Sequence, residues 1–319
     1  MRAERTIDAA LYEVGPSYRW LFLRAARRGK RVRLLLDNHA FDGNALTANR
    51  LLEAGGECRV LGSDARAAHW KLIVIDSHRV AVGTGNLIWR DAPRDAQGRF
   101  PPDCPPLHGT REWWILSDGA TSSHAAAGFE AAWQLGERPP ARWQSPADEV
   151  PPAAVGVPAP QVGPLTVRAP DCCAALVDGA RNVALAERSL IRQAANRLFI
   201  TVPYVHAQVP AVRALLDDCD AAVARGVDVR LLLGERQRST DMRELEQRRL
   251  TVRQMDPQRS TRGHAKGVVA DESVLLGSSN WSNGGLSINW EAAVMVRSAD
   301  AARYYADAFT RDWDASPAL

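Results

Sequence analysis

The sequence predicts an α/β protein of two units related by a pseudo-twofold axis, each a mixed sheet flanked by helices. Three observations lead to this fold class. Near-continuous apolar strands alternate with helices, which is typical of a sheet covered on both faces. The two halves of the chain repeat each other. A proline-rich segment separates the halves.

The repeat is clearest where a helix is followed by a strand. ARRGKRVRLLLD, which ends at Asp37, matches VARGVDVRLLLG, which ends at Gly234. In both, a glycine ends the helix and a fully apolar strand follows. The other matched segments are 6–14 with 198–206, 71–76 with 266–271, 79–86 with 273–280, and the strands 112–118 and 291–298, each followed by a helix.

These matches divide the chain into a first unit (1–136), a linker (137–164) and a second unit (165–319). The linker holds eight of the 19 prolines, and because proline fixes φ and removes an N–H donor, we expect an extended connector. A strand stub and an amphipathic helix at 176–196 break the repeat, since only five residues precede the first strand of the first unit. Either the first unit does without this element or the chain lacks its natural N-terminus.

Composition excludes several classes of protein. Basic residues number 40 and acidic residues 37, and a net charge of +3 does not by itself indicate a nucleic-acid or membrane-surface binder. No apolar stretch approaches the length of about 18 residues that spans a membrane, and no signal peptide is visible. We therefore expect no transmembrane segment and a cytoplasmic protein, or a secreted one if the natural N-terminus is missing. The five cysteines contain no CxxC pair and are expected to be thiols.

The motif that carries chemistry occurs once in each half. Its two HxKx4D copies are His69, Lys71 and Asp76 in the first half, and His264, Lys266 and Asp271 in the second. Each copy lies where a loop enters an apolar strand, so the histidine and lysine project to one face and the aspartate to the other. Only three of the 40 basic residues are lysines, and two of these belong to the motifs. A compact ammonium is thus kept at both positions in a chain that otherwise uses arginine.

Further polar residues follow each copy in the same order: Thr84, Asn86 and Glu112 in the first half, and Ser278, Asn280 and Glu291 in the second. Two such sets facing each other would form a pocket with two imidazoles and two ammonium groups. This pocket suits an anionic, tetrahedral centre such as a phosphodiester. An unperturbed histidine pKa near 6.5 allows one imidazole to be neutral while the other is protonated.

These residues resemble the phospholipase D superfamily, whose signature is a duplicated HxKx4D followed by GSxN. The resemblance covers essentially the whole chain, and Thr84 keeps the hydroxyl where the first copy usually has serine. It implies two phospholipase D-like α/β units with one active site. It also implies phosphodiester cleavage through a covalent phosphohistidine, with no cofactor and no metal.

The resemblance implies a role for each residue of the two sets. His69 is the expected nucleophile, and His264 the expected acid and then base. The phosphate oxygens are expected to be held by Lys71, Lys266, Asn86, Asn280, Thr84 and Ser278, although the two hydroxyls could instead serve a tight turn. Glu112 and Glu291 are each expected to orient the imidazole of their own copy. Asp76 and Asp271 are expected to be structural acceptors that hold loops in place.

Two kinds of phosphodiester substrate fit these residues. A phospholipid headgroup is the first, with hydrolysis or phosphatidyl transfer at a membrane surface, favoured by four tryptophans near the motifs: Trp70, Trp89, Trp113 and Trp281. DNA or RNA is the alternative, and a nuclease would use an arginine track such as 24–33 or 243–253. A binding module with an inactive site is a third hypothesis, disfavoured by two complete motifs. Because one chain carries both half-sites, we expect a monomer.

The largest difference between the halves lies beside the predicted site. Asn86 and Glu112 are 26 positions apart, but Asn280 and Glu291 only 11, so 15 residues are inserted around 91–109. Long proline-rich loops near a site are often lids or specificity elements, and a passive surface excursion is the alternative.

Deleting residues 93–106 should change substrate preference and leave the fold intact. The expected result is an altered ratio of turnover on phospholipid, nucleic-acid and small diester substrates, with an unchanged thermal midpoint. Kinetics equal to those of the wild type on every substrate would contradict a role for this loop.

Overall fold

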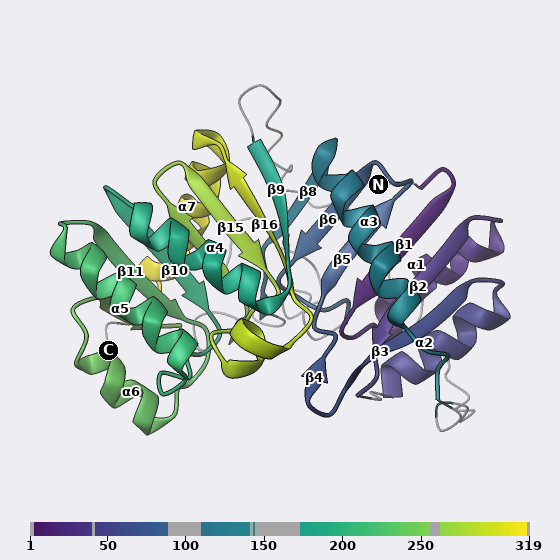
Figure 1. Ribbon diagram of the computed structural model, residues 1–319, viewed down its shortest axis with the longest axis horizontal. Helices are drawn as coiled ribbons and strands as arrows, with labels where there is room; N and C mark the ends of the chain where they lie inside the picture. The colour runs from purple at the N-terminus through teal and green to yellow at the C-terminus, as the bar shows by residue number, and fades with distance from the viewer. Residues whose placement is uncertain are drawn as a thin grey trace.

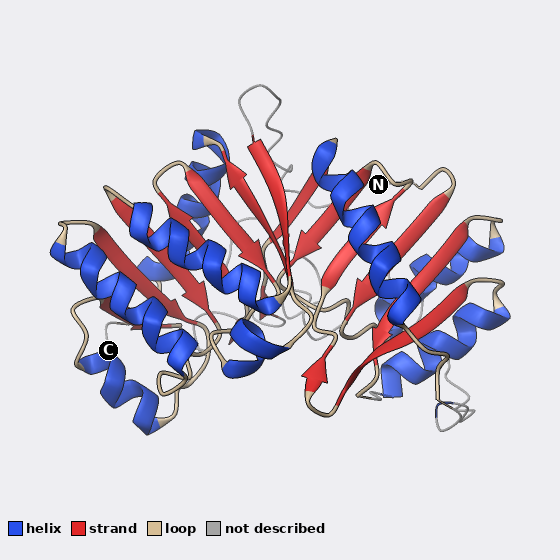
Figure 2. Cartoon of the chain, viewed as in Figure 1, coloured by secondary structure: helices blue, strands red, loops and turns tan. Residues whose placement is uncertain are grey.

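Two seven-stranded mixed sheets form the framework of the protein in the computed structural model, which describes residues 3–39, 42–88, 110–140, 143, 173–255 and 262–317 (Figure 1). The first sheet has the order β4-β3-β2-β1-β5-β6-β8, and the second β12-β11-β10-β14-β15-β16-β9. Helices flank both sheets (Figure 2). The predicted fold class of two mixed α/β units is confirmed.

The strands of the first sheet are β1 (Thr6–Leu11), β2 (Arg31–Asp37), β3 (Glu57–Ser63), β4 (Arg66–Ala67), β5 (Lys71–Ile75), β6 (Arg79–Gly83) and β8 (Trp114–Asp118). Those of the second are β9 (Cys173–Asp178), β10 (Arg197–Val202), β11 (Asp228–Leu233), β12 (Thr251–Gln254), β14 (Gly267–Ala270), β15 (Ser273–Gly277) and β16 (Ala292–Arg297). A separate pair, β7 (Thr110–Arg111) and β13 (Arg262–Gly263), is parallel and joins the units.

The pairing pattern is the same in both units. β1 is parallel to β2 and antiparallel to β5, and β10 is parallel to β11 and antiparallel to β14. The motif lysines therefore lie at matching places, at or just before the start of the strand that pairs with the central strand. The two sheets are related by the pseudo-twofold axis that the repeat predicts.

The helices follow the same symmetry. They are α1 (Pro16–Arg27), α2 (Asp42–Glu53) and α3 (Ala120–Leu135) in the first unit, and α4 (Ala180–Gln193), α5 (Pro210–Ala224), α6 (Ser239–Glu246) and α7 (Ala299–Asp314) in the second, with a short π-helix η3 (Gly284–Ile288). In Figure 1, α3 lies in front of the first sheet and α1 and α2 behind it, whereas α4 and α5 lie in front of the second sheet and α7 behind it. The glycines predicted to end α1 and α5, Gly29 and Gly226, have φ of 75° and 89°, which glycine adopts without a steric penalty.

The element expected at 176–196 is present as β9 and α4. β9 adds an edge strand beside β16, and α4 packs against α5 and the second sheet. In the described part of the first unit, only residues 3–5 precede β1, so no comparable helix is seen there.

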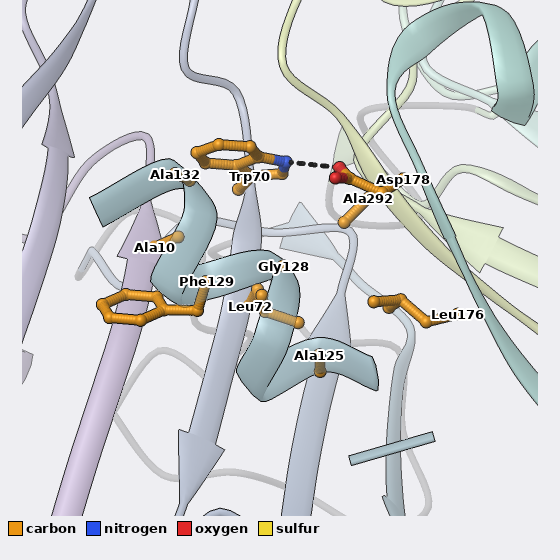
Figure 3. A pocket seen from close by; sticks show the side chains of 10 residues that line it. All are labelled: Ala10, Trp70, Leu72, Ala125, Gly128, Phe129, Ala132, Leu176, Asp178 and Ala292. Atoms are coloured by element: carbon orange, nitrogen blue, oxygen red, sulfur yellow. Dashed lines mark hydrogen bonds between the residues drawn. The ribbon is translucent and has the colours of Figure 1, made fainter. Parts of the chain in front are cut away.

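A shared core joins the units. One cluster of buried apolar side chains draws on α3 and the first sheet, and on α7 and the second sheet. Figure 3 shows part of this joint, where Phe129 of α3 and Leu176 of β9 line a small cavity. Trp70 Nε1 donates to Asp178 Oδ1 at 3.3 Å, and the Tyr305 hydroxyl donates to the Trp114 carbonyl at 2.6 Å. The units therefore form one packed body around the site.

Some predicted features lie wholly or mostly outside the described residues. These are the loop 91–109, Trp89, Cys104, Cys172 and most of the linker 137–164. The boundaries 1–136 and 165–319 therefore stay predictions. Among the helices of the described ranges, none combines the length and the apolar character required to cross a membrane.

The motif aspartates tie each motif hairpin to the start of the central strand. Asp76 accepts the backbone N–H groups of residues 4–6 at 2.7–2.8 Å, and Asp271 those of residues 195–197 at 2.7–3.1 Å. Burial raises the pKa of the Asp76 carboxyl, but the three N–H groups outweigh burial and lower it from 3.8 to about 2. These hydrogen bonds support the structural role of both aspartates, which stays a prediction.

Replacing Asp76 with asparagine should lower the free energy of unfolding by about 1–3 kcal/mol at pH 7, because the charged acceptor is lost. The carboxylate stabilises the fold fully above its ordinary pKa of 3.8, and this contribution is lost as the pH falls through about 2. The difference between wild type and variant in urea unfolding should therefore shrink below pH 4. The exposed Asp64→Asn is the matched control; equal midpoints for D76N and wild type at pH 7 would contradict this role.

Candidate active site

Backbone pairing between the units places the two motif histidines. His69 follows the Ala68–Trp290 bridge, and its N–H donates to the Trp290 carbonyl at 2.9 Å. His264 follows β13, and its N–H donates to the Arg111 carbonyl at 3.0 Å. Each histidine therefore lies beside the residue that directly precedes the glutamate of the other unit.

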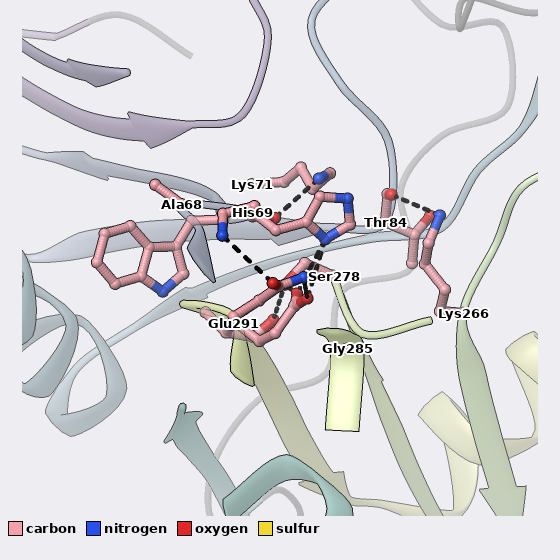
Figure 4. A network of polar contacts seen from close by, with 12 residues as sticks. Ala68, His69, Lys71, Thr84, Lys266, Ser278, Gly285 and Glu291 are labelled. Carbon is pink, nitrogen blue, oxygen red and sulfur yellow. Dashed lines mark hydrogen bonds and ion pairs between the residues drawn. The ribbon is translucent and has the colours of Figure 1, made fainter. Parts of the chain in front are cut away.

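The histidine–glutamate pairs are consequently crossed between the units. His69 Nδ1 lies 3.1 Å from both carboxylate oxygens of Glu291, and His264 Nδ1 lies 2.6 Å from Glu112 Oε1. Figure 4 shows the first of these pairs. The expectation that each glutamate orients the imidazole of its own copy is wrong. The register of the inter-unit bridges is the reason, because it brings each histidine to the glutamate of the other repeat.

Each buried glutamate is held by polar groups of its own unit. Glu112 accepts the hydroxyls of Thr84 and Thr110 at 2.5 and 2.7 Å. Glu291 accepts the Ser278 hydroxyl, and the Asn289 side-chain amide at 3.2 Å. These bonds compensate for the removal of the carboxylates from water.

The two motif hydroxyls do not face the site as phosphate ligands, which corrects their predicted role. Thr84 and Ser278 are fully buried, and each also accepts a backbone N–H, from Trp113 at 2.9 Å and from Ala292 at 3.0 Å. Their donor and acceptor positions are thus taken by the glutamate and the last strand. Gly85 leaves room for this arrangement, because a Cβ there would lie 2.5 Å from the Glu112 carboxyl carbon.

Both motif lysines are buried beside the histidines. Lys71 Nζ donates to the His69 carbonyl at 2.8 Å and lies 5.0 Å from the centre of the Tyr12 ring. Lys266 Nζ lies within 3.0 Å of both ring nitrogens of His264 and donates to the Thr84 carbonyl of the other unit at 3.2 Å. The two half-sites therefore form one site at the interface (Figure 4).

Electrostatics favour a neutral imidazole at His69. Its burial lowers the pKa below the ordinary 6.5, Glu291 acts in the opposite direction, and Lys71 lowers the pKa further. Burial would raise the pKa of Glu112, but His264 and Lys266 lower it to about 2, so this carboxylate is ionised at neutral pH.

The predicted asparagines lie at the ends of the loops that follow β6 and β15. Asn86 and Asn280 are partly buried. The Oδ1 atom of Asn280 is buried and has no hydrogen-bond partner within the described ranges. The phosphate-binding role of both residues stays a prediction.

Three tryptophans near the motifs are core residues. Trp70, Trp113 and Trp281 are 3%, 4% and 0% exposed. They do not form an apolar entrance for a lipid.

Sequence reasoning missed three residues of the site. Thr110 and Asn289 each stand two positions before a glutamate and bind it; their matching place in the repeat was a usable signal. Tyr12 packs edge-on against His69, with ring centres 4.8 Å apart. The repeat aligns Tyr12 with Tyr204, and this match was a usable signal.

Comparisons with known proteins agree with this geometry. Residues 188–313 match the family model described as cardiolipin synthase, PLD-like domain. No curated protein matches the sequence. Among solved structures, the chain is similar to a phosphatidylserine synthase from Haemophilus influenzae Rd KW20, with 14% identity, a TM-score of 0.68, and coverage of 100% of this chain and 83% of that one.

Two further solved structures are similar in part. A polyphosphate kinase from Porphyromonas gingivalis matches with 14% identity and a TM-score of 0.58 over 97% of this chain and 46% of that one. Nuc from Salmonella typhimurium, described as a phospholipase D family member, matches with 19% identity and a TM-score of 0.40 over 46% of this chain and 98% of that one.

Neutralising one glutamate should affect the histidine of the other repeat. In Glu291→Gln, the pKa of His69 should fall further, because the anion that raises it is gone, and the ring signals of His264 should not move. In Glu112→Gln, the ring signals of His264 should move and those of His69 should not. Nitrogen-15 NMR of histidine-labelled protein measures both; an effect confined to the histidine of the same repeat would refute the crossed arrangement.

Proposed function

We propose that the chain is a member of the phospholipase D superfamily and that it cleaves a phosphodiester through a covalent phosphohistidine on His69. One observation carries this proposal. Both imidazoles direct Nδ1 at a buried carboxylate. This leaves Nε2 of His69 for the substrate, and Nε2 of His264 lies 2.9 Å from Lys266 Nζ.

In the first step, Nε2 of neutral His69 attacks phosphorus. A P–N bond forms, the bond from phosphorus to the leaving oxygen breaks, and protonated His264 gives that oxygen its proton. The lowered pKa of His69 supports its assignment as nucleophile, since the attacking ring must be neutral.

In the second step, water attacks phosphorus and gives its proton to His264, and the P–N bond breaks to free His69. An alcohol in place of water would give transfer of the phosphoryl-bearing group. Lys71 and Lys266 supply positive charge for the non-bridging oxygens, joined by Asn86 and Asn280. No step requires a metal ion, because the two ammonium groups stabilise the added negative charge.

For the substrate we propose a phospholipid headgroup. The support is the similarity over the full chain to a phosphatidylserine synthase, whose name is that of a lipid enzyme. Trp70, Trp113 and Trp281 give no support to a lipid entrance, because they are buried in the core.

Nucleic acid is the second candidate because α1 presents exposed arginines at 24, 27 and 28. Fewer arginines of the track are available to nucleic acid than the sequence suggested. Arg33 is paired with Asp8 and Glu130, and Arg248 is held by three carboxylates. These two guanidinium groups serve the fold.

Alanine at His69 or at His264 should lower kcat for bis(p-nitrophenyl) phosphate by about 10³-fold or more, because the nucleophile or the proton carrier is lost. The exposed His124→Ala is the matched control and should retain full activity. Added EDTA should leave wild-type turnover unchanged. Full turnover in H69A, or loss of activity on chelation, would contradict the mechanism.

Two further measurements complete this test. Quenching the reaction in acid-free conditions and mapping the modified peptide should find phosphorus on His69; phosphorus on His264 would reverse the two roles. One sample assayed in parallel on phosphatidylcholine vesicles and single-stranded DNA decides the substrate, and turnover on DNA alone would replace the lipid proposal with the nuclease.

A further inference from the structure

A buried carboxyl group lies beneath the motif loop of the second unit. Glu187 of α4 is 3% exposed and accepts the indole N–H of Trp281 at 3.1 Å. Trp281 is fully buried and directly follows Asn280, which is proposed to bind phosphate. The bond thus connects α4 to the site through one side chain.

The first unit has a leucine at the corresponding place. Val205 bridges to Trp281 as Val14 bridges to Leu87, and the following N–H group donates to the Trp281 or Leu87 carbonyl at 2.9 Å in both units. Leu87 has no indole, and the described residues before β1 form no helix like α4. Leu87 donates its own N–H to the Glu13 carbonyl at 3.2 Å. The indole–carboxyl bond is therefore an additional anchor of the second motif loop, with no counterpart in the described part of the first unit.

The surroundings of Glu187 keep its carboxyl neutral at pH 7. Burial raises its pKa to about 8; the Trp281 bond opposes this, and the negative charge of Glu291 adds to it. Of the elements packed on α4, β9 ends at Asp178, β16 carries the exposed Arg297, and β14 and η3 carry no titratable side chain. α5 brings the buried Cys219 thiol and, nearer the surface, Arg213, Asp217, Asp218 and Asp220, of which Asp218 is paired with Arg188 and Arg192 of α4. No cation in these elements is directed at Glu187 among the contacts of the described chain.

We propose that Glu187 is a positioning residue of the active site, whose buried carboxyl group anchors the indole of Trp281 and thereby holds Asn280 in place for the phosphate. This inference rests on the proposed function, because it concerns the same site. An ionised Glu187 would add a second negative charge near Glu291. That charge would favour protonated His69, the form that cannot attack phosphorus.

The kinetic test uses the full chain and bis(p-nitrophenyl) phosphate. Glu187→Gln keeps a neutral acceptor for the indole and should retain kcat within about twofold at pH 7. Glu187→Leu removes the acceptor and should lower kcat by about tenfold with a smaller change in KM. Leu185→Gln, at a position of α4 that is 63% exposed, is the matched control and should behave as the wild type.

Trp281→Phe removes the donor and should reproduce the effect of Glu187→Leu, and the double variant should lose no more than either single one. If Glu187→Leu does not fold, Trp281→Phe alone tests the loss of the indole–carboxyl bond. Wild-type kcat in both E187L and W281F would overturn the positioning role.

An NMR measurement separates this inference from the proposed function. The indole N–H signal of Trp281, assigned with W281F, should move with a midpoint near pH 8 in the wild type and stay fixed in Glu187→Gln. An indole signal that does not move between pH 6 and 10 in the wild type would contradict a Glu187 carboxyl group that is neutral at pH 7. A wild-type chain that cleaves no phosphodiester would overturn the proposed function and, with it, the catalytic part of this inference.

Discussion

Two short backbone contacts between the units decide which carboxylate each histidine meets. Ala68 bridges to Trp290, and β13 pairs with β7, so each motif segment runs beside the segment that leads to the glutamate of the other repeat. A shift of one residue in either contact would turn the histidine to the opposite face. The site therefore exists only when both units are folded and packed together, and neither repeat contains a complete histidine–glutamate pair.

The buried carboxylates make this arrangement costly unless it is complete. Glu291 is fully buried, and a carboxyl group away from water is tolerated only when hydrogen bonds surround it. The side chains of Ser278, Asn289 and His69 provide these hydrogen bonds. The motif hydroxyl therefore binds the glutamate and does not bind the substrate. The contact with Glu291 fixes the tautomer of His69 and leaves its Nε2 for the attack on phosphorus.

Much of the fold could be predicted from the sequence because the chain contains two copies of the same repeat. Strand periodicity, the glycines after α1 and α5 and the two motifs gave the paired sheets, the shared site and the place of Asp76 and Asp271. The crossed pairing could not be predicted, since it depends on the register of β7 with β13, two-residue strands that carry no pattern. Glu187 was also missed, because a lone acidic residue in an amphipathic helix has no spacing that points to a site.

A double-mutant cycle on kcat tests the crossed pairing most directly. His69→Ala and Glu291→Gln should be strongly non-additive, with a coupling of about 1–3 kcal/mol, as should His264→Ala and Glu112→Gln. His69→Ala with Glu112→Gln, and His264→Ala with Glu291→Gln, should couple more weakly. Stronger coupling within each repeat than between the repeats would contradict the arrangement on which the rest of the account depends.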